Sequence, residues 1–323
     1  MSAVLGSTGL PVSRIGLGLA ALGRPAYITL RRDRDLGAAR SQEAMERRAH
    51  EVMDAAYEAG IRYFDAARSY GYAERFLASW LERDEPLRKV TVGSKWGYRY
   101  TAGWRLDAEV NEVKDHSLEA LRRQYAESRS ILGDRLALYQ IHSATLESGV
   151  LEDRRVLAEL ARLRDEGLVI GLTASGPRQG EVIRRALEVS VDGVNPFSAV
   201  QATWNVFEPS VGPALSEARK SGWGVIVKEA LANGRLTSNG APPAELARVA
   251  DAHGVGPDAV ALAAALSQPW ASVCLSGAVS VDQLRSNVAA PAVTLSNHEL
   301  DRLARLAEPP EQYWRTRAGL PWR

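Results

Sequence analysis

The sequence has little of what several classes of protein require. It holds one cysteine, Cys274, which excludes an intramolecular disulfide and favours a reducing, cytoplasmic location. One cysteine and five scattered histidines also lack the spacing of a zinc site, so no metal is expected. The fold must therefore be stabilised by its own packing.

An excess of charge of one sign is also missing. Lys and Arg number 40 against 39 Asp and Glu, so neither nucleic acid nor an anionic membrane is favoured as a partner. No run of about 18 apolar residues occurs, and the N-terminus "MSAVLGSTGLPVSRIG" lacks the basic-then-apolar pattern of a signal peptide. The composition predicts a soluble protein that binds small molecules, and it leaves the oligomeric state open.

Short apolar runs alternate with longer amphipathic runs, such as "RRVLAELARLRDEG", along most of the chain. This alternation predicts βα units and a parallel sheet. We expect a hairpin in "VLGSTGLPV", followed by strands near residues 15–19, 62–65, 90–95, 136–141, 169–173, 199–203, 224–228 and 272–275. Without a linker or a shift of composition, they predict one α/β domain over residues 1–323. Its expected fold is a (β/α)8 TIM barrel with an N-terminal β-hairpin and enlarged loops at the C-terminal face.

A doubly wound, dinucleotide-binding sheet is the main alternative to the barrel. The stretch "GLGLAALG", from Gly16, has G-x-G after a strand, but the third glycine of the motif and the helix that should begin there are missing. Tight packing at the end of the first strand explains these glycines better.

Polar residues stand where the predicted strands end, at the edge that carries the chemistry of such barrels. Asp65 ends the second strand, Tyr70 lies in the next loop, Lys95 ends the third strand and His142 follows the fourth. A buried Lys95 requires a partner such as Asp65. Its ammonium would lower the pKa of the Tyr70 phenol, and His142 would orient a carbonyl oxygen. The four residues together predict proton transfer to a carbonyl group.

Each of these residues has an ordinary structural explanation when it is taken alone. Asp65 is of a type that often caps helices, His142 is of a type that often lies satisfied in a core, and Lys95 has a stem long enough to reach solvent. Their joint occurrence at consecutive strand ends favours the catalytic interpretation.

The chain also resembles the aldo-keto reductase superfamily. The resemblance rests on "GIRYFDAARSYGYAERFLASWL", "VTVGSKWG", "LALYQIHSATLE", "LARLRDEGLVIGLTASG", "VQATWNVFE", "GWGVIVKEALANGRL" and "LSGAVSVDQLRSNVAA". It implies an NAD(P)(H)-dependent oxidoreductase that transfers a hydride between nicotinamide and the carbonyl carbon of an aldehyde or ketone, or that oxidises the alcohol. By position, Tyr70 matches the family's proton donor, Asp65 and Lys95 its supporting ion pair, and His142 its carbonyl-orienting residue.

The resemblance also implies contacts with the nicotinamide end of a cofactor. Gln201 matches a glutamine that binds the carboxamide, and Thr173 stands where serine is frequent. Ala174 replaces an asparagine that often binds the same carboxamide, so Ser175 is the candidate substitute. Ala230 falls where an aromatic side chain often stacks on the nicotinamide.

The residues with which the family usually binds a 2′-phosphate are altered. Gly277 and Gln283 replace a Lys and an Arg, although Arg285 remains near, and Asn287 matches an adenine contact. NADP(H) is the expected cofactor, with NAD(H) as the alternative. The full set of expected cofactor-binding residues is Thr173, Ser175, Gln201, Lys228, Gly277, Ala278, Gln283 and Asn287.

Aromatic residues predict a substrate pocket. Trp96, in "SKWGYRYTAGW", and Trp204 are its expected members, although such rings equally often pack long loops onto a barrel. The charged segment at residues 27–42 is either a solvated lid or part of a cofactor clasp.

Two other functions stay open. Lys228 ends the seventh strand, where Schiff-base aldolases keep their nucleophile, although the adjacent Glu229 favours an ion pair or a cofactor contact. The altered nicotinamide contacts at Ala174 and Ala230 suggest instead a redox-sensing, nicotinamide-binding regulatory protein with slow chemistry.

Overall fold

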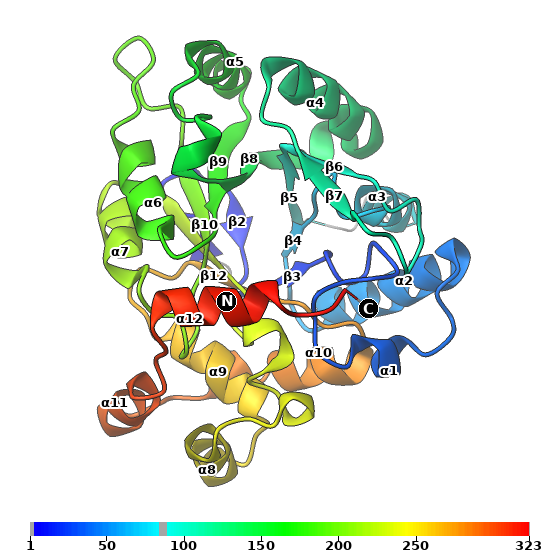
Figure 1. Cartoon of the computed structure of the whole chain (residues 1–323), viewed down its shortest axis with the longest axis vertical. Coiled ribbons are helices and arrows are strands. Elements are labelled where there is room, and N and C mark those ends of the chain that lie inside the picture. Colours follow the sequence, from blue (N-terminus) through cyan, green and yellow to red (C-terminus); the bar gives the residue numbers. More distant parts are fainter. Residues whose placement is uncertain (1–2, 84–88, 323) are drawn as a thin grey trace.

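A closed barrel of eight parallel strands forms the centre of the computed structural model, which describes residues 3–83 and 89–322 (Figure 1). Each strand pairs with its neighbours in chain order, and the last pairs with the first, as predicted for a (β/α)8 TIM barrel. The barrel strands are β3 (Ile15–Gly18), β4 (Tyr63–Asp65), β5 (Thr91–Trp96), β8 (Leu136–Ala144), β9 (Val169–Ala174), β10 (Ala199–Thr203), β11 (Gly224–Lys228) and β12 (Val273–Ser276).

The observed strands agree with the predicted ones to within three residues at each end. The largest difference is β8, which continues past the predicted end to Ala144. A register shift between Ile141 and Ala144, with Ser143 at a positive φ of 49°, places a bulge there. Bulges commonly adjust strand ends beside functional sites, and this one lies next to His142.

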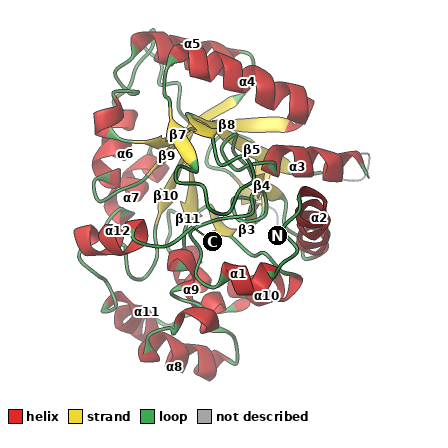
Figure 2. Ribbon diagram, turned by 45° about the vertical axis from the view of Figure 1, so that its right-hand side comes forward, coloured by secondary structure: helices red, strands yellow, loops and turns green. Residues whose placement is uncertain are grey.

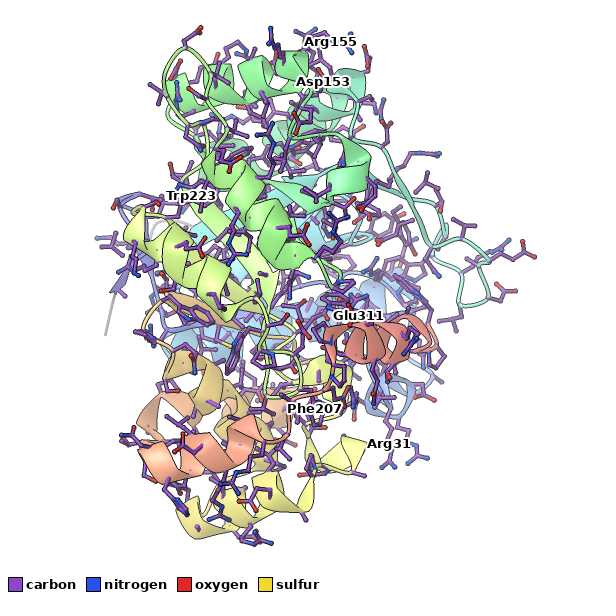
Figure 3. The ribbon with its side chains drawn as sticks, turned by 60° about the vertical axis from the view of Figure 1, so that its left-hand side comes forward. Arg31, Asp153, Arg155, Phe207, Trp223 and Glu311 are labelled. Carbon is purple, nitrogen blue, oxygen red and sulfur yellow. The ribbon has the colours of Figure 1, made fainter. Side chains whose placement is uncertain are left out.

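Helices form the outer layer of the barrel (Figure 2). Several begin at the side-chain caps that their sequences predict; Asp153, for example, accepts a hydrogen bond from the backbone N–H of Arg155 (2.9 Å) at the start of α5 (Figure 3). The helices are α1 (Arg32–Leu36), α2 (Gln42–Glu58), α3 (Ala73–Glu82), α4 (Leu118–Leu132), α5 (Arg154–Asp165), α6 (Gln179–Leu187), α7 (Gly212–Lys220), α8 (Ala244–His253), α9 (Pro257–Leu266), α10 (Val281–Asn287), α11 (Asn297–Ala304) and α12 (Pro310–Ala318).

The two ends of the barrel are closed differently. At the N-terminal end, the predicted hairpin of β1 (Ala3–Val4) and β2 (Pro11–Val12) is present, and Leu5 and Val12 pack beneath the barrel. At the C-terminal end lie a second hairpin, β6 (Tyr98–Tyr100) with β7 (Glu112–Lys114), and the last helix, α12, which crosses in front of the strands (Figure 1). The C-terminal end therefore carries the loops that shape a site.

None of the helices within residues 3–83 and 89–322 combines the length and the apolar character that crossing a membrane requires.

Gly93 offers a test of packing inside the barrel. A methyl group there would come within 2.4 Å of the Tyr63 hydroxyl oxygen, so Gly93→Ala should lower the free energy of unfolding by about 1–3 kcal/mol through overpacking. Urea denaturation measures this loss. Gly180→Ala is the control, because its methyl would lie 3.7 Å from the nearest side chain and would favour helix α6; an equal loss in both variants would contradict the packing argument.

Candidate active site

A cavity of about 480 Å³ opens at the C-terminal ends of the barrel strands. Its volume is typical of small-molecule sites. Tyr70 and His142 line it at the catalytic end, and Gln283 and Asn287 line it beyond β12. The cavity therefore joins two groups of residues that the sequence analysis singled out separately.

A buried ion pair lies at the base of the catalytic end. Lys95, 1% exposed, donates hydrogen bonds to the Asp65 carboxylate and to the Ala66 carbonyl oxygen (2.9 Å). The other Asp65 oxygen accepts hydrogen bonds from the Tyr63 hydroxyl and the Gln201 amide, each at 3.0 Å. Both charges are therefore compensated, as a buried pair requires.

Tyr70 lies directly above this pair. The centroid of its ring is 4.7 Å from the Lys95 ammonium, and its edge-to-face contact with the His142 ring has a centroid distance of 5.4 Å. The guanidinium of Arg24 approaches the same ring at 5.1 Å. The structure thus brings together Asp65, Tyr70, Lys95 and His142, which the sequence places on three strand ends and a loop.

The acidity of Tyr70 differs from expectation. Burial and the nearby Asp65 carboxylate raise the pKa of Tyr70 well above 10, and Arg24 opposes the rise. The expected net lowering of the Tyr70 pKa is therefore wrong, because burial and the Asp65 carboxylate outweigh the cations beside the ring. Tyr70 is consequently a protonated phenol at neutral pH, as a proton donor must be before reaction.

His142 is held as a neutral imidazole. Burial lowers its pKa well below 6.5, and the charges of Lys95 and Lys228 act in the same direction. Its Nδ1 is 3.3 Å from the Ser69 hydroxyl, within hydrogen-bond distance. A neutral ring in this position is able to donate a hydrogen bond to a carbonyl oxygen without competing as an acid.

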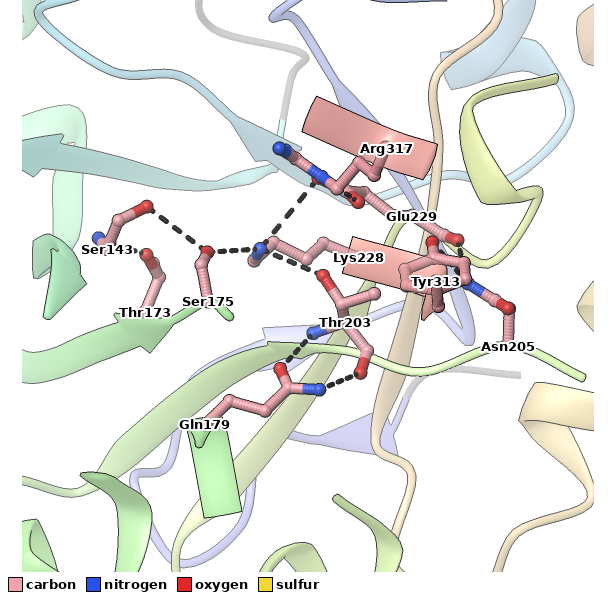
Figure 4. A network of polar contacts seen from close by, with 10 residues as sticks. All are labelled: Ser143, Thr173, Ser175, Gln179, Thr203, Asn205, Lys228, Glu229, Tyr313 and Arg317. Carbon is pink, nitrogen blue, oxygen red and sulfur yellow. Dashed lines mark hydrogen bonds and ion pairs between the residues drawn. The ribbon is translucent and has the colours of Figure 1, made fainter. Parts of the chain in front are cut away.

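Hydroxyl groups surround Lys228 at the ends of β9, β10 and β11 (Figure 4). Its ammonium donates to Ser175 Oγ (2.9 Å) and Thr203 Oγ1 (3.0 Å), and Thr173 Oγ1 accepts from the backbone N–H of Ser143 (2.7 Å). Burial lowers the pKa of Lys228 to about 8.

Glu229 is shared between two cations, Lys228 and Arg317. Arg317, on α12, donates to Glu229 at 2.7 Å, whereas Lys228 lies 3.9 Å from the same carboxylate (Figure 4). Although burial opposes ionisation, Arg317 and then Lys228 lower the pKa of Glu229 to about 2. The expected ion pair of Glu229 with Lys228 is therefore present, and Glu229 also fastens the C-terminal helix to the cavity through Arg317.

The other expected cofactor residues lie at the far end. Asn287, 2% exposed, donates to Ser276 Oγ (2.8 Å), and Gln283 Oε1 accepts from the Val279 N–H (2.9 Å). All eight residues expected to bind the cofactor line this one cavity: Thr173, Ser175, Gln201, Lys228, Gly277, Ala278, Gln283 and Asn287.

Two residues expected in the substrate pocket do not line the cavity. Trp96 is fully buried against His116, and Trp204 packs edge-to-face on Trp270, at centroid distances of 5.7 and 5.9 Å. Successive strand residues point to opposite faces, so with Lys95 directed into the barrel, Trp96 is directed outward. The expectation for both tryptophans is thus corrected: they pack the outer layer.

The sequence analysis missed Arg24 and its partner Glu112, which both line the cavity. Arg24, 2% exposed, donates to Glu112 (3.0 Å) and lies over the rings of Tyr27 and Trp322, at 4.6 and 4.8 Å. The sequence signal that could have identified Arg24 as a cavity residue is its position in the loop after the first strand, in "ALGRPAY". Tyr27 and Trp322 form the aromatic wall that was expected from the two tryptophans.

Over the described part of the chain, no group of three or more His, Cys, Asp or Glu is arranged to hold a metal ion. The candidate site therefore consists of the ion pair, the phenol, the imidazole and the polar groups along the cavity.

The model of the Aldo/keto reductase family matches residues 14–308. The chain belongs to this family. It is 25% identical to the aldo-keto reductase str7 of Strobilurus tenacellus, with 80% of this chain and 81% of that protein aligned. It is 28% identical to an L-galactose dehydrogenase of Arabidopsis thaliana, with 88% and 86% aligned.

A solved structure of an aldo-keto reductase from Bacillus halodurans, in its holo form, shares the fold with a TM-score of 0.72 at 22% identity, covering 97% of this chain and 99% of that one. Membership of the family makes the chain an oxidoreductase that depends on a nicotinamide cofactor. The cavity fits such a group, because buried amides and hydroxyls line both of its ends and are able to satisfy a polar dinucleotide.

The neutral state of His142 predicts how stability depends on pH. Between pH 7 and pH 5 the unfolded chain binds a proton at this histidine and the folded chain does not, so the free energy of unfolding should fall by up to about 2 kcal/mol from this group. His142→Gln should reduce that fall in urea titrations; His116, whose burial lowers its pKa to about 4, keeps part of it. The exposed His298→Gln is the control, and an equal effect there would contradict the assignment.

Proposed function

We propose that the chain transfers a hydride between a nicotinamide dinucleotide and the carbonyl carbon of an aldehyde or ketone, or performs the reverse oxidation of an alcohol, with Tyr70 as the proton donor or acceptor. The observation that carries the proposal is the position of the protonated Tyr70 phenol between Lys95, Arg24 and His142 at one end of the cavity.

The roles of the residues follow from their charges. When bound, the nicotinamide supplies or accepts the hydride. His142 holds the carbonyl oxygen by a hydrogen bond, and the Tyr70 hydroxyl gives that oxygen its proton. Lys95 and Arg24 stabilise the phenolate that forms, because both cations lie within about 5 Å of the ring. Asp65 holds the Lys95 ammonium in place by a hydrogen bond.

The cofactor is proposed to lie along the cavity. Thr173, Ser175, Gln201 and Lys228, at the ends of β9, β10 and β11, would hold the nicotinamide half. Gly277, Ala278, Gln283 and Asn287, after β12, would hold the adenosine half. This direction places the reacting ring beside Tyr70.

The substrate is proposed to carry hydroxyl groups. The catalytic end is lined by two ion pairs, Arg24–Glu112 and Arg317–Glu229, which offer donors and acceptors beside an aromatic wall. Sugars combine hydroxyl edges with apolar faces and suit such a lining. Two relatives support the idea by name: the L-galactose dehydrogenase and a D-threo-aldose 1-dehydrogenase of a Pseudomonas species, which is 24% identical over 205 residues. Their names also favour the oxidative direction.

Tyr70→Phe tests the proton transfer. With NADH or NADPH and a panel of aromatic, aliphatic and sugar carbonyls, the variant should lose at least about 100-fold in kcat while its dissociation constant for the dinucleotide stays unchanged. The loss is measured as absorbance at the nicotinamide band, and binding by fluorescence titration.

Tyr72→Phe is the matched control, since Tyr72 lies two residues away and stacks on Trp104 outside the cavity lining. Unchanged turnover in Tyr70→Phe would exclude Tyr70 as the donor. Binding without turnover in the wild type, over the whole panel, would favour the regulatory alternative suggested by Ala174 and Ala230.

A second candidate function is favoured by the state of Lys228. A pKa of about 8 and an ammonium that faces the cavity are properties of a lysine able to form an imine with a carbonyl, losing one water. On the oxidoreductase proposal, Lys228 instead donates hydrogen bonds and stays a free amine.

Trapping with sodium borohydride separates the two candidates. Incubation with a carbonyl panel and borohydride, followed by peptide mass spectrometry, should leave Lys228 unmodified. Lys228→Met is the control for labelling elsewhere. A stable adduct confined to Lys228, together with no nicotinamide oxidation, would support the aldolase instead.

A further inference from the structure

The segment at residues 27–42, called the strap below, lies along the cavity. Its Leu30 backbone N–H donates to the Asn233 carbonyl oxygen (2.9 Å), after β11. Its Asp35 carboxylate accepts from Gln283 Nε2 (2.8 Å), on α10. The strap thus joins the loops that follow the first, seventh and eighth barrel strands, and Asp35 itself lines the cavity.

The charged side chains of the strap lie in different surroundings. Arg32 is fully buried and donates to the carbonyl oxygens of Ala21 (3.0 Å) and Pro25 (2.8 Å), which fixes helix α1 against the loop after β3. Arg31 is exposed and lies on the outer surface (Figure 3). The one charged residue by which the strap lines the cavity is therefore Asp35, which Gln283 holds in place.

The cavity is polarised from end to end. Its lining cations, Arg24, Lys228 and Arg317, belong to the catalytic end, where Glu112 and Glu229 pair with them. The far end is lined by three carboxylates, Asp35, Asp258 and Asp282, and by no Lys or Arg from the described residues. Since the nicotinamide must lie beside Tyr70, the adenosine half of the cofactor falls at the acidic end.

We propose that Asp35 makes this enzyme select NAD(H) over NADP(H). A carboxylate accepts a hydrogen bond from a ribose 2′-hydroxyl, whereas a 2′-phosphate requires a cation such as Arg. At this end of the cavity a phosphate would lie near Asp35 and the buried Asp258 and would be repelled. The inference rests on the proposed function, and it replaces the sequence-based expectation of NADP(H).

The nearest cations do not neutralise the carboxylates at the acidic end of the cavity. Arg285 is ion-paired with Asp282 (3.5 Å), and its side chain is 75% exposed. Arg48 donates to the backbone carbonyl oxygen of Asp35 (3.1 Å). Neither side chain lines the cavity.

Direct binding tests the inference. Fluorescence titration of the full-length wild type with NADH and with NADPH should give a dissociation constant at least tenfold lower for NADH. Asp35→Asn keeps an oxygen for Gln283 but removes the charge. It should reduce the ratio of the NADPH to the NADH dissociation constant at least fivefold, chiefly because NADPH binds more tightly. Gln283→Arg, which adds a cation at the same point, should narrow it further.

Asp33→Asn is the matched control, because Asp33 belongs to the same helix and lines a separate small hollow beside Leu320. It should leave the ratio unchanged. In the wild type the ratio should also shrink as salt rises from 0.05 to 0.5 M, because salt screens repulsion; a purely steric exclusion would not respond.

The outcomes separate this inference from the proposed function. NADPH binding as tightly as NADH, or a ratio that Asp33→Asn changes as much as Asp35→Asn, would overturn the role of Asp35 and leave the oxidoreductase proposal standing. Failure of both dinucleotides to bind would overturn the proposed function itself, and with it the selection of NAD(H).

Discussion

The arrangement of the site depends on the buried ion pair between Asp65 and Lys95. Neither charge would be stable alone inside the barrel, so each needs further hydrogen-bond partners. The Ala66 carbonyl oxygen accepts a hydrogen bond from Lys95, and Tyr63 and Gln201 donate to the second carboxylate oxygen of Asp65. Gly93 leaves room for the Tyr63 hydroxyl, since any side chain would displace it. A single electrostatic requirement thus determines residues on three strands, β4, β5 and β10.

The same pair also determines the state of Tyr70. Because Asp65 neutralises the ammonium, the net field at the phenol disfavours its ionisation, and burial disfavours it further. The cations beside the ring limit the resulting rise of the Tyr70 pKa, and the same attraction would stabilise a phenolate formed by proton transfer. On the proposed function, Tyr70 would thus be protonated when a carbonyl binds, and the cost of losing that proton would be limited.

Much of this could be predicted from the sequence, for a geometrical reason. The ends of parallel strands meet at one edge of a barrel, so polar residues at strand ends, such as Asp65, Lys95 and His142, were placed together without coordinates. The predictions that were wrong or incomplete depended on side-chain direction, on contacts between distant segments and on burial. Trp96 points outward because of strand alternation, and Trp204, just after β10, packs on Trp270. The contacts Arg24–Glu112, Arg317–Glu229 and Asp35–Gln283 join segments far apart in the chain, whose relative positions no local pattern specifies. The predicted direction of the Tyr70 pKa shift was wrong because it took account of the Lys95 charge but not of the burial of the phenol.

The hairpin beneath the barrel has a consequence for how the enzyme is supplied with protons. Leu5 and Val12 close the bottom of the barrel with apolar side chains, so the ionisable groups inside meet bulk water only from above. With cofactor and substrate seated there, that route is covered as well. On the proposed function, Tyr70 would then be the group that exchanges a proton with the substrate oxygen in each cycle, and its starting protonation state would be restored only after the product leaves.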